Sequence, residues 1–227
     1  MRTFSFLLIL MVVMAGSGCK GTEPPTTPTT TAATAPAGTQ QATVAQAITQ
    51  EQVVAEIEKC GGWVRRDGNA PDGQVVEVAL GDPSKEAVTD TVLEDLKGLG
   101  KLQALRLTGA TVTDAKLVHL EGLIQLRVLV LGFTKVSDTG LEHLKGLNQL
   151  QGLELLATRV TDAGLEHLKG LNQLRYMGLG NTKVTDAGLE HLRGLDQLGE
   201  LDLKDTSVTD QGVKKLQKSL PKCKISH

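Results

Sequence analysis

The chain has 227 residues, of which 40% are hydrophobic, 22% charged and 2% aromatic, which is enough for one sizeable domain with extensions. This composition excludes collagen-like, disulfide-scaffold and polytopic membrane proteins. The net charge of -2, from 24 Lys and Arg against 26 Asp and Glu, provides no broad positive field, so we expect no nucleic-acid partner.

Residues 1–18 have the layout of an export signal. Arg2 supplies a positive charge, residues 4–15 are apolar apart from Ser5, and small residues precede Cys19. The apolar run is shorter than the roughly 18 to 20 residues of a transmembrane helix. The Ser-Gly-Cys ending resembles the lipobox of bacterial lipoproteins, although Gly16 stands where that motif usually has an aliphatic residue. The resemblance implies lipidation at Cys19 and a membrane-anchored protein of the bacterial cell envelope; a secreted or periplasmic protein is the alternative.

Residues 19–48 follow as the predicted lipidated N-terminus and linker. Thr, Pro, Ala and Gln dominate this segment, and large apolar side chains are almost absent. Such a segment cannot offset its ordering entropy by burial. We therefore expect a disordered spacer that holds the following domain away from the anchor.

Residues 49–87 are predicted to form an N-terminal cap. Thr49 and Gln52 fit a capping box at the start of an amphipathic helix, which Gly61-Gly62 would end. Residues 63–65 and 75–80 have the character of two strands that pair as a hairpin. The second of these strands would align with the strands that follow and cover the first layer of leucines.

Residues 88–207 are five copies of one 24-residue repeat. The register is marked by a valine that recurs at a constant step: Val88, Val112, Val136, Val160, Val184 and Val208. Residues 208–227 are a truncated sixth copy and C-terminal cap, in which lysines face solvent. The period and a Leu-x-x-Leu-x-Leu strand segment such as 150–155 resemble the leucine-rich-repeat superfamily, especially exported bacterial members and the ribonuclease-inhibitor-like and cysteine-containing subclasses.

The side-chain pattern of one repeat predicts its local structure. Leu153 and Leu155 alternate with polar or small residues, as in a short strand with one buried face. Leu165 and Leu168 lie on one helical face, and Gly170 suits a left-handed helix end. The Thr-Asp pair that recurs at each helix start is expected to cap that helix.

These units predict an α/β fold, a right-handed solenoid. One repeat cannot bury its leucines, so stability requires stacking. Strands stack about 4.8 Å apart whereas helices need about 8 to 10 Å, so the stack is expected to curve with a parallel sheet on its concave side and short helices on its convex side.

The concave face is the candidate partner-binding site. In the family that the repeat resembles, the fold is a scaffold for protein interaction, and enzymatic activity belongs to other domains. The exposed strand positions that we assign to binding are Arg106, Val128, Val130, Phe133, Glu154, Leu156 and Tyr176. Aromatic and apolar side chains concentrate at interaction sites, but Val and Tyr also favour pleated surfaces in general, so ordinary strand propensity is the alternative interpretation.

The recurring histidines, the recurring aspartates and the two cysteines of the domain do not predict a catalytic, metal or cofactor site. Four histidines share one repeat position, and neighbouring helices would hold them too far apart to bind one metal ion together. Protonation of this row of histidines would loosen the convex face mildly. Helix capping accounts for the aspartates. Cys60 and Cys223 would lie at opposite ends of the stack, beyond disulfide reach, as buried thiols. The histidines are His119, His143, His167 and His191.

The sequence therefore favours a non-enzymatic, monomeric interaction scaffold that binds a protein or a glycan at the cell envelope. A structural or self-associating envelope component without a soluble ligand is the alternative. An enzyme is a more distant third.

Overall fold

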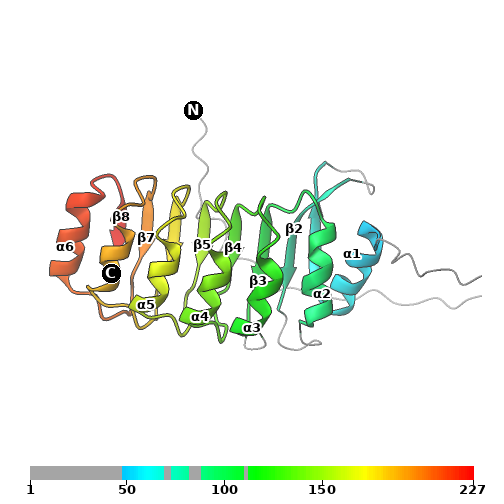
Figure 1. The fold of residues 1–227 in the computed structure, drawn as a ribbon, viewed down its shortest axis with the longest axis horizontal. Coiled ribbons are helices and arrows are strands. Elements are labelled where there is room, and N and C mark those ends of the chain that lie inside the picture. Colours follow the sequence, from blue (N-terminus) through cyan, green and yellow to red (C-terminus); the bar gives the residue numbers. More distant parts are fainter. Residues whose placement is uncertain (1–47, 69–72, 82–87, 110–111) are drawn as a thin grey trace, which may run out of the picture. The chain divides into compact units, whose positions relative to one another are not determined.

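The computed structural model describes residues 48–68, 73–81, 88–109 and 112–227. They form one eight-stranded sheet with a layer of short helices on one of its faces (Figure 1). The export signal, the linker and Cys19 lie outside the described residues. No helix among the described residues is long and apolar enough to span a bilayer.

The strands follow one another across the sheet in chain order. The first pair, β1 and β2, is antiparallel, as the predicted hairpin requires, and every later pair is parallel. The bounds are β1 Trp63–Arg66, β2 Val75–Leu80, β3 Ala104–Leu107, β4 Val128–Val130, β5 Gly152–Glu154, β6 Tyr176–Gly178, β7 Glu200–Asp202 and β8 Lys224–Ser226.

Each repeat between successive strands carries a short helical segment over the same face of the sheet. The α-helices are α1 Gln50–Lys59, α2 Asp90–Asp95, α3 Asp114–Leu117, α4 Asp138–Leu141, α5 Asp162–Leu165 and α6 Asp210–Ser219. The 3₁₀ segments are η2 Leu96–Gly98, η3 Val118–Leu120, η4 Glu142–Leu144, η5 Glu166–Leu168 and η6 Gly188–Leu192. Repeated leucines from the strands and helices, among them Leu153, Leu155, Leu165 and Leu168, are fully buried in one continuous core, so the predicted fold class is confirmed.

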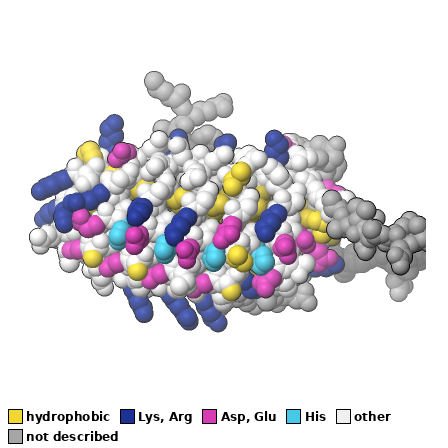
Figure 2. Space-filling model, viewed as in Figure 1, with side chains coloured by type: hydrophobic (Ala, Val, Ile, Leu, Met, Phe, Trp, Pro, Cys, Tyr) yellow, Lys and Arg dark blue, Asp and Glu magenta, His cyan; other side chains and the backbone are white. Residues whose placement is uncertain are grey.

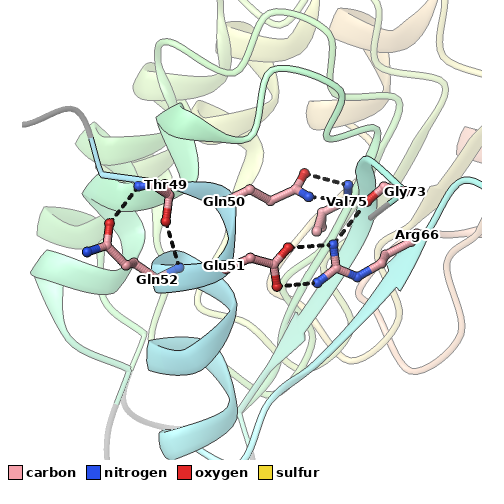
Figure 3. A network of polar contacts seen from close by, with 7 residues as sticks. All are labelled: Thr49, Gln50, Glu51, Gln52, Arg66, Gly73 and Val75. Carbon is pink, nitrogen blue, oxygen red and sulfur yellow. Dashed lines mark hydrogen bonds and ion pairs between the residues drawn. The ribbon is translucent and has the colours of Figure 1, made fainter. Parts of the chain in front are cut away.

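The N-terminal cap is fastened by polar contacts at the start of α1 (Figure 3). Thr49 and Gln52 form the predicted capping box, with the Thr49 amide donating to Gln52 Oε1 at 2.8 Å. The side chain of Gln50 accepts from the Val75 amide, and Glu51 forms a bidentate ion pair with Arg66. These contacts join the helix to both strands of the hairpin, so the cap closes the core as one unit.

The recurring aspartates link neighbouring repeats, which corrects the prediction that they cap their own helices. Asp138 accepts from the Thr161 amide at 2.8 Å through Oδ1 and from the Thr161 hydroxyl at 2.7 Å through Oδ2. We call this pair of hydrogen bonds a rung of an aspartate ladder. Equivalent rungs join Asp114 to Ser137, Asp162 to Thr185 and Asp186 to Thr209. The hydroxyl of Thr161 does act as a cap, since it accepts from the Ala163 amide. The aspartate ladder therefore fixes the register between repeats.

A glycine in the next repeat makes room for each rung. A Cβ on Gly164 would lie 2.4 Å from Asp138 Oδ1, and the same clash recurs at Gly140, Gly188 and Gly212. Lys116 occupies the equivalent position in the first repeat boundary, and there no hydrogen bond joins Asp90 to Thr113 among the described residues. The rung is thus present where the glycine is present.

The left-handed backbone position is also different from the predicted one. Gly170 has no positive φ, and the turn that contains it is open, since a Cβ at this position would meet no atom within 4 Å. Positive φ recurs instead just after the strands, at Gly109, Phe133, Ala157, Asn181 and Asp205. The chain must turn sharply there to leave the sheet. The sequence did not predict this turn, because glycine stands at only one of the five equivalent positions.

Cys60 and Cys223 are buried, as predicted, in the first and the last layers of the stack. Burial, together with the charge of Glu200, raises the pKa of the Cys223 thiol to about 11. The thiol therefore stays protonated, and unreactive, at neutral pH.

Candidate functional site

The strand register defines the sheet face that the helices leave uncovered. Residues directly opposite one another in paired strands point to the same side of a sheet. One row runs through Arg65, Glu77, Ala104, Val128, Gly152, Tyr176, Glu200 and Lys224, and the next through Trp63, Ala79, Arg106, Val130, Glu154, Gly178, Asp202 and Ser226. We call this surface the open sheet face; five of the predicted site residues lie in these two rows.

The aromatic side chains of residues 49–227 lie outside the core, and two of them lie on the open sheet face. Residues 49–227 contain three aromatic side chains, Trp63, Phe133 and Tyr176. The buried core is built from aliphatic residues with Met177 and two cysteines, and none of the three is part of it. Trp63 is 50% exposed and opposite Ala79, on the open sheet face. Sequence reasoning assigned Trp63 only to the cap; the alternation within residues 63–66 was the signal that places it on this face.

Phe133 is held in an unfavourable conformation with its ring in solvent. Its φ is 60°, and its side chain is 63% exposed. A bulky residue in the left-handed region is strained, whereas the residues at the equivalent positions of two other repeats, Gly109 and Asn181, tolerate a positive φ more easily. The Phe133 amide donates to the Leu156 carbonyl at 2.8 Å, so the ring is attached beside the next repeat. The folded chain gains little from burying this ring.

Further apolar side chains lie in the repeat of Phe133 and in the next one. Leu156 lies against two glycines of the sheet exit, because a Cβ on Gly180 would be 3.0 Å from Leu156 Cδ1 and one on Gly132 would be 3.8 Å from Leu156 Cβ. Val128 lies over Gly152, at 3.8 Å from a Cβ built there. The predicted apolar residues are therefore spread over adjacent repeats with small residues between them. We call Val128, Val130, Phe133 and Leu156 the apolar patch.

Glu154 and Tyr176 form one polar unit next to the apolar patch. The Tyr176 hydroxyl donates to Glu154 Oε2 at 2.5 Å, and the Leu156 amide donates to Glu154 Oε1 at 2.9 Å. Gly178 makes room for the carboxylate, since a Cβ there would lie 2.2 Å from Oε1. Burial, followed by the hydrogen bond to Glu154, raises the pKa of the Tyr176 phenol above its ordinary value. The phenol thus remains a neutral hydrogen-bond donor.

Arg106 is engaged in an ion-pair chain at the other end of the face. Its Nε donates to Glu77 Oε1 at 2.8 Å, and Arg65 Nε donates to Glu77 Oε2 at 2.8 Å. Burial of Glu77 favours the protonated acid, but the hydrogen bonds from the two arginines outweigh it and hold the pKa of the carboxyl below its ordinary value. Sequence reasoning missed Glu77, although an acidic residue within the apolar strand 75–80 was a signal for it.

The predicted histidine row lies on the helix-bearing face and alternates with charged residues (Figure 2). His143 Nδ1 is 2.6 Å from Glu121 Oε1. Hydrogen bonding and charge from Lys145, with smaller contributions from His167 and His143, lower the pKa of Glu142. Protonated histidines would therefore meet carboxylates, which opposes the predicted loosening of this face in acid. No group of His, Cys, Asp or Glu in the described part of the chain is arranged to hold a metal ion.

Comparison with known proteins bears on the fold alone. No protein-family model matches the chain, and no curated protein matches it. Internalin C2 from Listeria monocytogenes matches with a TM-score of 0.54 and 23% identity, over 77% of this chain and 82% of that chain. A leucine-rich-repeat protein of Leptospira interrogans matches with a TM-score of 0.48 and 22% identity, over 59% of this chain and 33% of that longer chain. The repeating strand and helix units and the likeness to internalin C2 show that the described residues adopt the leucine-rich-repeat fold.

Proposed function

We propose that the chain is a non-enzymatic interaction protein that binds a protein partner through the open sheet face. The observation that carries the proposal is the placement of the aromatic residues. Trp63, Phe133 and Tyr176 are all outside the core, and Phe133 is both strained and exposed. Exposed aromatic side chains are the commonest energetic anchors of protein interfaces. The fold imposes a left-handed backbone at this position in each repeat, but it does not require a bulky side chain there, so the phenylalanine points to a function.

The apolar patch and the polar unit of Glu154 and Tyr176 have complementary roles in this proposal. The patch supplies area that a partner desolvates, and Phe133 supplies a projecting ring. The carboxylate of Glu154 is already fixed by two donors, so it presents its charge without further ordering on binding. Ordinary strand propensity accounts for Val128 and Val130, but it gives no reason for a phenylalanine at a left-handed position.

The cellular location of the protein is part of the same proposal. We infer export by the signal in residues 1–18 and attachment to the bacterial envelope through a lipid on Cys19, supported by the lipobox-like sequence and the Thr- and Pro-rich linker. Mass spectrometry of the N-terminal peptide from native membranes tests it, with Cys19→Ser as the control. A peptide that begins after residue 18 without an added lipid would leave a secreted protein as the better interpretation.

The binding proposal is tested by a pair of variants in one repeat. Val130→Glu with Phe133→Ala changes the apolar patch. Val118→Glu with Ile124→Ala makes the same kinds of change at two exposed apolar residues, 41% and 59% exposed, outside that patch. Crosslinking and affinity capture from native envelopes should recover partners with the wild type and the second variant but lose them with the first.

Equal recovery with both variants would exclude the apolar patch as the binding site. Light scattering on the purified chain tests the self-association alternative, because a dimer that Val130→Glu dissociates would identify a second copy as the occupant.

A further inference from the structure

The last coil of the solenoid, residues 208–227, carries a concentrated positive charge. It contains five lysines, all exposed, and a single acidic residue, Asp210, which gives 5 − 1 = +4 in a chain whose net charge is -2. The lysines are Lys214, Lys215, Lys218, Lys222 and Lys224. Dark-blue side chains accordingly gather at the end of the molecule that α6 covers (Figure 2).

The packing of α6 places these charges outward. Gly212 and Leu216 are buried against the core, so the lysines of the helix occupy its opposite side. Lys215 pairs with Glu190 at 2.8 Å, and the carboxylate of Asp210 pairs with His227 at 2.7 Å. Of the remaining four lysines, none forms an ion pair within the described residues, so their charge is available to a ligand.

The surroundings of the lysines narrow the class of ligand. None of the large exposed hydrophobic residues lies in this coil, so it has no anchor of the kind that protein interfaces use. Residues 208–227 contain neither arginine nor an aromatic residue, which nucleic-acid sites use for phosphate forks and base stacking. Adsorption to anionic lipid headgroups requires only a dense positive charge near a surface.

We propose that this C-terminal end docks on the surface of an anionic phospholipid bilayer. Each lysine near such a surface strengthens binding roughly fivefold at moderate ionic strength. In this arrangement residues 208–227 would contact the bilayer and the other repeats would extend away from it, so that the middle of the open sheet face stays accessible. The proposal rests on the lysines alone, and it holds whichever partner the open sheet face binds.

The test measures binding of the full chain to vesicles of phosphatidylcholine with and without about one-third phosphatidylglycerol, near 0.15 M salt. The variant is Lys214→Gln, Lys218→Gln and Lys222→Gln. Lys145→Gln, Lys169→Gln and Lys183→Gln is the control, because it removes the same charge from exposed lysines elsewhere. We expect the added binding to anionic vesicles to fall about 100-fold in the first variant and less than about fivefold in the control.

Amine acylation followed by mass spectrometry locates the contact. Anionic vesicles should protect the lysines of residues 214–224 and leave Lys145 and Lys169 reactive. Equal losses in the two variants, equal binding to both kinds of vesicle, or tighter binding of an oligonucleotide through the same lysines would each overturn the proposal. Val130→Glu with Phe133→Ala should keep wild-type vesicle binding, so that failure of the binding function and failure of this proposal are distinguishable.

Discussion

Replacing Gly164 by alanine should break one rung of the aspartate ladder. The new Cβ would lie 2.4 Å from Asp138 Oδ1 and 3.1 Å from Leu141 Cδ1. The carboxylate of Asp138 has to move. It then loses the two hydrogen bonds that it accepts in the wild type from the amide and the hydroxyl of Thr161, at 2.8 and 2.7 Å. Gly170→Ala is the matched control in the same repeat, since nothing lies within 4 Å of that position.

The expected cost follows from these contacts. Two hydrogen bonds to a partly buried carboxylate contribute about 3 kcal/mol at the lower end of their usual range. Alanine in place of glycine in α5 stabilises the fold by about 1 kcal/mol, because alanine has the higher helix propensity. The net loss for Gly164→Ala is therefore about 2 kcal/mol, or about 4 to 8 °C in Tm for a domain of this size, whereas Gly170→Ala should be neutral or slightly stabilising.

Circular dichroism melting and amide exchange at Thr161 measure both consequences. The Thr161 amide should exchange faster in Gly164→Ala and at the wild-type rate in Gly170→Ala. In the background of Asp138→Ala the penalty of Gly164→Ala should shrink by more than about 1 kcal/mol, because the clashing atom is gone. Equal melting of the two glycine variants, or the same penalty in both backgrounds, would refute the reasoning.

Three further predictions concern the open sheet face and the apolar patch. Glu77→Gln should cost about 1 to 3 kcal/mol at neutral pH, because a neutral amide replaces the carboxylate that pairs with Arg106 and Arg65. The pKa of Glu77 is lowered in the folded state, so this stabilisation is complete above the ordinary glutamate value and is lost as the pH falls through the folded value; the Tm difference between wild type and variant should vanish in strong acid. Tyr176 is the only tyrosine, so absorbance near 295 nm should show its phenolate forming at a higher pH in the folded chain than in the unfolded chain, and Glu154→Gln should lower the pKa of the phenol. Phe133→Asn should raise the stability by about 0.5 to 1 kcal/mol in denaturant unfolding while weakening partner capture; a loss of stability would show that the ring contributes to folding.

The sequence alone determined the layers of this molecule. A constant period of 24 residues with leucines at strand and helix spacing leaves stacking as the only way to bury them. Within each strand, leucines alternate with other residues. This alternation placed Val128, Val130 and Tyr176 on the uncovered side of the sheet, because successive side chains along a strand point to opposite faces.

Only the tertiary structure decided how the repeats meet. Asp138 bonds to a threonine 23 residues away, and Glu154 to a tyrosine 22 residues away, because stacking brings equivalent positions of successive repeats together while a single repeat contains neither contact. The strain at Phe133 likewise depends on where the chain leaves the sheet. Local sequence fixes what each repeat can bury, whereas contacts between repeats fix which polar groups are paired and which aromatic rings stay exposed.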